Sequence, residues 1–203
     1  MNTKNVYLFA LFALALTFFA NPNVFAATTP LGVGIVPPIQ FPASDWDIAG
    51  LRVSGLWGKA REVHAIDLGV VGNMTTGSFA GLAVAGGFNH TGGNTTILGL
   101  QLAGLTNLNM QKTSVYGVQA ALLYNYNKAE AKVVGLQFAV ANNAAFTTIY
   151  GLQAGLYNKA KSVYGFQIGL VNMATDLHGL QIGLANFHHD GIFKVSPIIN
   201  FGF

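Results

Sequence analysis

The chain has 203 residues, of which 52% are hydrophobic and only 8% are charged. Soluble globular proteins carry about 25% charged residues, so this composition argues against an ordinary water-exposed surface. The net charge of +3 is too small to favour nucleic acid as a partner, and the absence of cysteine excludes disulfides and thiol chemistry.

Residues 1–26 are expected to form a secretory signal peptide. Lys4 supplies the positive start, and the segment from Val6 to Ala20 is an apolar run of suitable length. Ala26 precedes the expected cleavage point, so the mature chain would begin at Ala27. No later stretch reaches the roughly 18 unbroken apolar residues that mark a spanning helix.

Residues 27–49 contain a Pro-rich arm with the sequence PLGVGIVPPIQFP. Pro37 and Pro38 have no N–H group to donate to a β-ladder. This segment is therefore expected to be an edge strand or a loose arm ahead of the main domain.

Residues 50–203 repeat one phrase and are expected to form one β domain. Copies such as GVQAALLYN, GLQAGLYN and GLQIGLAN alternate a small or polar residue with a bulky apolar one, which is the period of a strand. A tenth unit begins at Phe193, and the nine copies before it open at Gly50, Ala65, Gly81, Gly99, Gly117, Gly135, Gly151, Gly165 and Gly179. Each unit resembles one strand of about ten residues plus a turn, which is enough to cross a bilayer at a tilt.

The alternation predicts two faces of different chemistry. The bulky face is expected to contact acyl chains, and its candidates are Leu152, Phe166, Ile168, Leu170, Leu180, Ile182 and Leu184. The small face carries glutamines that are candidates for the barrel interior or for packing: Gln101, Gln119, Gln137, Gln153, Gln167 and Gln181. A hydrogen-bonded ladder is favoured for these amides over a polar ring around a lumen, because amides inside a wall must find partners.

Charged and aromatic residues mark the ends of the units. The charges lie between copies of the phrase, with Arg52 and Asp67 as exceptions. Three tyrosines immediately precede the phrase: Tyr116, Tyr150 and Tyr164. Two others lie near its end, Tyr124 and Tyr157. Amphipathic rings at both ends of a strand suit the two interfaces of a bilayer.

The sequence offers few candidates for catalytic or metal-ligating residues. His188, His189 and Asp190 are adjacent and are interpreted as a polar turn, because metal or triad chemistry needs partners that converge from elsewhere. No close carboxylate pair lies within a strand. The expectation is a protein without catalytic residues, metal or cofactor, and hence not an enzyme.

The chain ends with Ile199, Phe201 and Phe203 on one face of an alternating segment. This ending resembles the signature by which the barrel-assembly machinery recognises outer-membrane barrels. It predicts that machinery as a partner, through Phe203, and the outer membrane of a Gram-negative bacterium as the location.

Together these features predict an all-β fold, a transmembrane antiparallel β-barrel of about ten repeat-derived strands. Closed sheets and helices are the structures that satisfy every backbone group in lipid, and no spanning helix is present in the sequence pattern. The glycine-rich face would fill a barrel thinly, which favours packing between subunits and a homo-oligomer.

The series LGVGIVPPIQFP, GLRVSGLWGKAREVHAIDLGVVGN and the serial GLQ-x-GL-x-N units resembles the surface-repeat family that includes PopA, the porin-like protein of predatory bacteria. The likeness covers nearly all of the mature chain. It implies an outer-membrane protein that oligomerises into a bowl-like ring and traps or organises membrane lipid.

Three other interpretations stay open at this stage. A narrow passive porin would use the same barrel. A cell-surface β-solenoid adhesin fits the length of this repeat, because one coil of a solenoid can occupy each interval and the intervals do not alternate between short and long as in an up-and-down barrel. A small lipid-modifying barrel enzyme is least favoured, since no nucleophile and base pair stands out.

Overall fold

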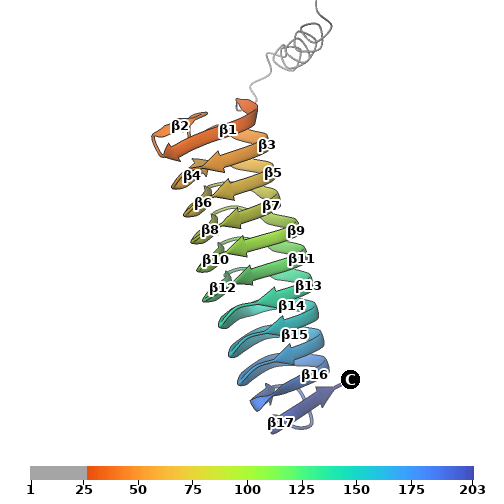
Figure 1. Ribbon diagram of the computed structural model, residues 1–203. Helices are drawn as coiled ribbons and strands as arrows, with labels where there is room; N and C mark the ends of the chain where they lie inside the picture. The colour runs from red at the N-terminus through yellow and green to blue at the C-terminus, as the bar shows by residue number, and fades with distance from the viewer. Residues whose placement is uncertain (1–26) are drawn as a thin grey trace, which may run out of the picture.

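The computed structural model describes residues 27–203, so the predicted signal peptide lies outside the described residues. The described part is all-β, as predicted. It is a parallel β-solenoid of about ten turns, and the predicted transmembrane antiparallel barrel is therefore wrong (Figure 1). The repeats stack along one axis, and they do not close around a lumen.

Seventeen strands make up the solenoid within the described residues. They are β1 (Thr28–Val36), β2 (Ile39–Phe41), β3 (Asp47–Ser54), β4 (Trp57–Ala60), β5 (Glu62–Gly69), β6 (Gly72–Thr75), β7 (Phe79–Ala85), β8 (Phe88–Thr91), β9 (Thr95–Ala103), β10 (Thr106–Asn109), β11 (Thr113–Ala121), β12 (Tyr124–Asn127), β13 (Ala131–Phe138), β14 (Ala141–Ala154), β15 (Tyr157–Ile168), β16 (Val171–His188) and β17 (Val195–Gly202).

Each turn contributes one segment to each of two parallel sheets. Sheet A contains β1, β3, β5, β7, β9, β11, β13 and the later segments of β14, β15 and β16. Sheet B contains β4, β6, β8, β10, β12 and the first segments of β14, β15 and β16. Equivalent residues of successive phrases lie opposite each other, so that Gly117 pairs with Gly135 and Gln119 with Gln137.

The unit that the alternation predicted as one ten-residue strand is bent. Gly169 and Leu170 form a corner between the sheet A segment of β15 and the sheet B segment that begins β16. Past this corner the side-chain alternation restarts, and Asn172 is buried although a straight strand would place it on the bulky face. The amide of Asn158 holds the preceding corner by donating to Gly155 O at 3.2 Å and Ile168 O at 2.9 Å. Because a side-chain amide donates to the corner carbonyls, this bend costs little free energy. An alternation of residues with a period of two does not reveal it.

The glycine that opens the phrase is required by close packing between turns. Gly117, Gly135 and Gly151 have φ between 128° and 135°, a region that L side chains rarely adopt. A Cβ atom on Gly135 or Gly151 would lie 2.2 Å from the carbonyl oxygen of the equivalent glycine one turn earlier. The repeat of glycine thus sets the distance between the sheet A backbones.

Ala65 occupies this position in the second copy with φ of 136°. Replacement of Ala65 by Gly should stabilise the protein by about 1 kcal/mol, because the relief of a strained backbone exceeds the entropy cost of glycine. Urea denaturation followed by circular dichroism measures this difference. Glycine at Ala49, an exposed neighbour in β3 without positive φ, should instead destabilise and serves as the control.

Both ends of the stack carry a reversed strand. β2 pairs antiparallel with β1, and the Gln40 amide accepts from Lys59 N at 3.1 Å and donates to Lys59 O at 2.6 Å, which occupies the edge of β4. At the other end β17 runs antiparallel along β16. The tenth unit at Phe193 is therefore a cap of opposite direction and not another turn, and its Asn200 faces inward with 1% exposure.

The interior is a narrow seam between the two sheets. An apolar row runs along the sheet A side two residues before each phrase-opening position, and it consists of Ile48, Val63, Phe79, Ile97, Val115, Val133, Ile149, Val163 and Leu177. Alanines and small polar residues from sheet B complete the seam. All bulky residues of the phrase itself point outward.

Candidate functional site

Two amide ladders fill the polar half of the interior. The six glutamines predicted for the interior are buried, at 0–1% exposure, and each Nε2 from Gln119 onward donates to the Oε1 of the previous glutamine at 2.6–2.8 Å. The structure therefore places these residues in a hydrogen-bonded stack with no lumen beside it.

The asparagines that close the phrases form a second ladder, which the sequence reasoning missed. From Asn73 to Asn186 each Nδ2 donates to the Oδ1 of the next asparagine at 2.8–2.9 Å. The signal was present in the sequence, because an asparagine ends nearly every phrase. The two ladders donate in opposite directions, so the orphan acceptors are Asn73 Oδ1 at one end and Gln181 Oε1 at the other.

The charged exceptions Arg52 and Asp67 belong to the glutamine row. They occupy its first two positions and are 3% and 1% exposed. Arg52 Nε donates to Asp67 Oδ1 at 2.7 Å and Nη2 to Oδ2 at 2.5 Å, a bidentate pair. Burial raises the pKa of the Asp67 carboxyl, and the Arg52 guanidinium opposes that shift. This pair occupies the places of two rungs of the ladder.

The outer surface of sheet A, here called the A face, is almost wholly apolar near the corners. Its central row consists of Leu51, Ile66, Leu82, Leu100, Val118, Leu136, Leu152, Phe166 and Leu180. Its corner-side row consists of Val53, Leu68, Val84, Leu102, Ala120, Phe138, Ala154, Ile168 and Ile182. All seven predicted lipid-contact residues lie in these rows or at the corners.

The corners add a third apolar stripe, here called the corner row. Its exposed members are Leu56, Val70, Val71, Leu105, Leu122, Leu123, Val140, Leu156, Leu170 and Leu184. Four predicted lipid-contact residues, Ile168, Leu170, Ile182 and Leu184, meet there in an open apolar hollow of about 520 Å³. Phe166, Leu152 and Leu180 lie in the central row beside it and not in its lining.

On the other side of the A face lies a tyrosine row. It contains Leu98, Tyr116, Val134, Tyr150, Tyr164 and His178 in register. The rings of Tyr150 and Tyr164 stack at 4.9 Å between centroids, those of Tyr164 and His178 stack at 4.5 Å, and Lys132 Nζ lies 5.1 Å from the Tyr150 centroid. Tyr124 and Tyr157, predicted for an opposite bilayer interface, lie instead on sheet B.

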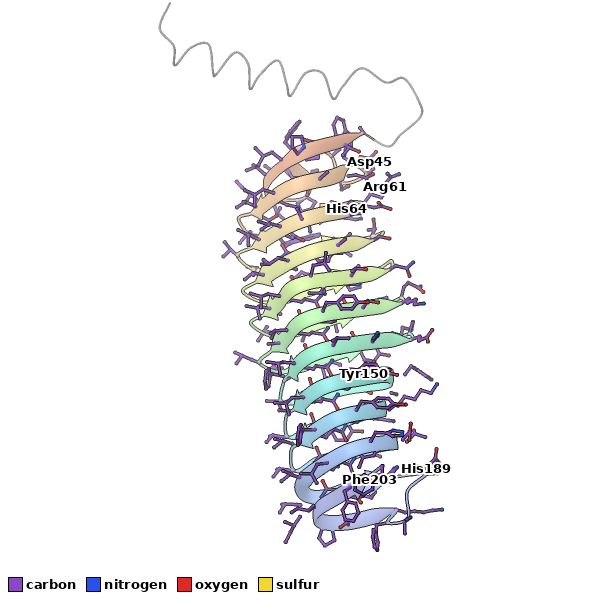
Figure 2. The ribbon with its side chains drawn as sticks, turned by 90° about the vertical axis from the view of Figure 1, so that its right-hand side faces the viewer. Asp45, Arg61, His64, Tyr150, His189 and Phe203 are labelled. Atoms are coloured by element: carbon purple, nitrogen blue, oxygen red, sulfur yellow. The ribbon has the colours of Figure 1, made fainter. Side chains whose placement is uncertain are left out.

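Beyond the tyrosine row, the loops that return to sheet A gather the charges along one long edge, here called the charged edge. Figure 2 shows Asp45, Arg61 and His189 on this edge, while the opposite edge carries hydrocarbon side chains. Arg61 and Asp47 form an exposed bidentate pair there, and Asp176 lies 3.5 Å from His178. Most of the charges predicted between phrases thus gather on one edge, although its loops at 76–78, 92–94 and 145–148 carry none.

His188, His189 and Asp190, which were predicted to form a polar turn, do not share one environment. Within residues 27–203 no group of three or more His, Asp and Glu side chains is placed to hold a metal ion. His188 is buried, whereas its neighbours His189 and Asp190 are exposed in the loop that leads to β17. His188 Nε2 accepts a hydrogen bond from the backbone N–H of Leu177 at 3.1 Å, which ties the last sheet B segment of β16 to the sheet A segment before it.

The His188 contact predicts a loss of stability in acid. Burial lowers the pKa of His188, and the shift is opposed by Asp176 and Asp190 and reinforced by His178. The unfolded chain then binds a proton that the folded chain excludes, so stability is complete above the ordinary histidine pKa of about 6.5 and falls as pH decreases below it. Melting temperatures at pH 7.5 and 5.5 measure the effect. The drop should be smaller in His188→Gln, which keeps an acceptor but does not titrate.

Comparisons with protein-family models, curated proteins and solved structures found no match to this chain. No helix within residues 27–203 has the length and hydrophobicity to cross a membrane. The function therefore has to be argued from the surface itself, and the A face with the corner row is its most unusual feature.

Proposed function

We propose that this chain is an exported lipid-binding β-solenoid without catalytic turnover, which inserts its corner row into one leaflet of a membrane. The observation that carries this proposal is the order of residues across the A face. From the corner to the charged edge, the turns of β11, β15 and β16 present aliphatic side chains first, then Tyr116, Tyr164 or His178, and then Lys112, Lys161 or Asp176. A membrane interface has the same order of hydrocarbon, amphipathic and ionic zones.

The extent of this face supports the proposal. Nine strands about 4.8 Å apart and three outward rows about 7 Å apart give it roughly 900 Å², whereas soluble monomers rarely expose more than a few hundred contiguous Å² of apolar surface. Single exposed leucines are ordinary, but a continuous field on this scale needs a partner.

The distance from the corner row to the tyrosine row also matches the thickness of one leaflet. Leu170 at the corner and Tyr164 in the tyrosine row are six residues apart, or roughly 20 Å along a strand. One leaflet measures about 15 Å of hydrocarbon and slightly over 20 Å with its interfacial zone. The corner row would therefore reach the middle of the bilayer while the stacked tyrosine rings lie among the headgroups.

The backbone can enter lipid at the corners without penalty. Leu170 N and Val171 N both donate to Leu156 O, at 3.0 and 2.9 Å, and Gly169 N donates to Ile182 O at 3.0 Å. Unpaired backbone groups are what excludes most irregular structure from the hydrocarbon region. Stacking of the turns supplies these partners along the whole row.

The resemblance to the surface-repeat family extends this proposal. An outer-membrane location, a bowl-like ring of identical subunits and the trapping of lipid by that ring remain proposals. The apolar A face supports them by offering a surface to lipid or to another copy. Contact between Phe203, which is fully exposed, and the barrel-assembly machinery also remains a prediction.

Vesicle flotation tests the proposal. The purified mature chain should float with neutral phosphatidylcholine vesicles, and Leu170→Asp with Leu184→Asp should reduce binding at least tenfold, because two carboxylates would have to enter hydrocarbon at roughly 2–4 kcal/mol each. The matched control adds two acids on the charged edge, Asn94→Asp with Gln111→Asp. Equal binding by both double variants, with unchanged circular dichroism, would refute edge-on insertion.

A second function, that of a cell-surface β-solenoid adhesin, is favoured by the extent of the A face, whose strands run the length of the stack (Figure 1). Its area is close to the roughly 800 Å² that one partner contributes to a stable protein interface. An adhesin would not float with neutral vesicles, and its binding to a protein would be sensitive to charges placed in the central row. Flotation therefore separates the two functions.

A further inference from the structure

A hollow of about 370 Å³ lies on the outer side of sheet B at the C-terminal end, away from the A face. Successive turns build it, and the loop before β17 closes one side. Its lining includes Lys159, Met173, Phe187, His189, Lys194 and Val195.

The floor of this hollow is apolar. Lys159 pairs in register with Met173, and Phe187 pairs with Val195 of β17. Tyr157 Oη donates to Met173 Sδ at 3.4 Å, which holds the thioether in place. No acidic side chain belongs to the lining.

The rim of the hollow is cationic. Lys159 and Lys194 form no ion pair with any residue in the part of the chain that the structure describes. His189 is 3.9 Å from Asp190, and both side chains are largely exposed. Two unpaired ammonium groups over an apolar floor attract an anion that carries hydrocarbon.

The hollow also has the right height for such a ligand. Lys159 is three residues beyond the corner residue Leu156, and His189 is five residues beyond Leu184, which correspond to roughly 10 and 16 Å along the strands. With the corner row at the centre of the bilayer, the floor lies beside the upper acyl chain and His189 lies where the headgroups begin. The backbone of Lys159 lies within the hydrocarbon, and its long side chain extends toward the phosphate.

We propose that this hollow binds the phosphate and upper acyl chain of an anionic phospholipid. This inference rests on the proposed lipid-binding function and names the lipid class that a specific site selects. The ammonium groups of Lys159 and Lys194 donate to the phosphate oxygens, and Met173, Phe187 and Val195 contact the first methylenes of the chain.

Vesicle binding at physiological salt tests the site. Wild type should prefer phosphatidylglycerol over phosphatidylcholine vesicles, and Lys159→Gln with Lys194→Gln should remove roughly 25-fold of that preference, since each lysine near an anionic surface contributes about fivefold. The control is Lys112→Gln with Lys128→Gln, which removes the same charge from the charged edge, several turns away from the hollow. It should lose no more than about threefold. Equal losses in the two double variants would overturn the site, because diffuse attraction would then explain the preference.

Two further measurements distinguish failure of the proposed function from failure of the proposed site. Binding of wild type to phosphatidylcholine reports on the corner row alone, and its absence would refute edge-on insertion. The site would then stand or fall with the difference between the two double variants on phosphatidylglycerol vesicles. Soluble glycerol phosphate at millimolar concentration should compete weakly with vesicles, since it lacks the acyl chain. Full competition would show that the hollow takes free phosphate, and the assignment to a lipid would be wrong.

Discussion

Gly151→Ala should be among the most destabilising single substitutions in this chain. Gly151 has φ of 135°, and an added Cβ atom would lie 2.2 Å from Gly135 O and 3.1 Å from Gly135 C. Neither atom belongs to a flexible side chain, so the two turns must separate. We expect a loss of roughly 4 kcal/mol, the sum of a strained backbone and a broken interface between neighbouring turns.

The expected loss of stability concerns the interface between two neighbouring turns. A solenoid is a series of such interfaces. Because each turn contacts only its neighbours, a defect between β13 and β14 should split unfolding into separate transitions of the two halves. Urea denaturation followed by circular dichroism and by tyrosine fluorescence would report them as non-coincident curves.

Gly99→Ala is the matched control for this effect. Gly99 has φ of 100°, but an added Cβ atom would have no neighbour within 4 Å. Its cost should be limited to the backbone conformation, about 1–2 kcal/mol. A Gly151→Ala variant that loses no more than Gly99→Ala would show that contact between the turns does not set the glycine repeat.

The strands and their two faces can be predicted from the sequence, but the choice between a barrel and a solenoid cannot. The period of two is a property of the strand, and it correctly predicts strands and the division of the phrase into a bulky and a small face. Both a barrel and a solenoid use that division. The alternation of Phe166, Gln167 and Ile168 is identical in the two folds, so the fold has to be decided by something else.

The corner and the direction of stacking decide between a barrel and a solenoid. Gly169 and Leu170 look like two more alternating residues, and only the hydrogen bonds of Asn158 and Asn172 to corner carbonyls reveal a bend. The nearly uniform spacing of the phrases is the available clue, because a solenoid returns to the same edge after every turn. The low charge points instead to a membrane wall, and giving it more weight than the spacing leads to a barrel.

The candidate surface is predictable in composition and not in arrangement. Leu170 and Leu184 share the predicted lipid contact with Phe166, yet their place at the corner depends on the bend. The tyrosines are predicted for two interfaces, and the parallel register instead stacks Tyr150, Tyr164 and His178 on one face. The hollow beside Lys159 could not be predicted, because it needs the reversed strand β17.

Asp67→Ala should cost about 3–5 kcal/mol, as expected for a buried ion pair that loses one partner. Arg52 would keep its charge at 3% exposure with a single remaining hydrogen bond, from Nη1 to Met74 O at 3.1 Å. Thermal unfolding at neutral pH should show the loss as a clear decrease in melting temperature, of at least about 5 °C.

The repeat itself supplies the control for this experiment. Arg52 and Asp67 stand in the row that later turns fill with glutamine, and they lie opposite each other in the same register. Arg52→Gln with Asp67→Gln should therefore restore the rung geometry of Gln101 and Gln119, in which one amide donates to the other at 2.8 Å. We expect this double variant to lie within about 1.5 kcal/mol of wild type, because replacing a whole buried pair avoids the desolvation of a lone charge.

The comparison of these variants tests whether the interior is a true repeat. Ala83 follows Asp67 in the row and precedes Gln101, so the two early rungs are separated from the glutamine ladder by one small residue. If the interior tolerates any satisfied pair, the double variant will fold like wild type and only the single variants will fail. A double variant as unstable as Asp67→Ala would show that the ion pair makes a contribution that hydrogen-bonded amides cannot replace, and that the first turns are not equivalent to the later ones.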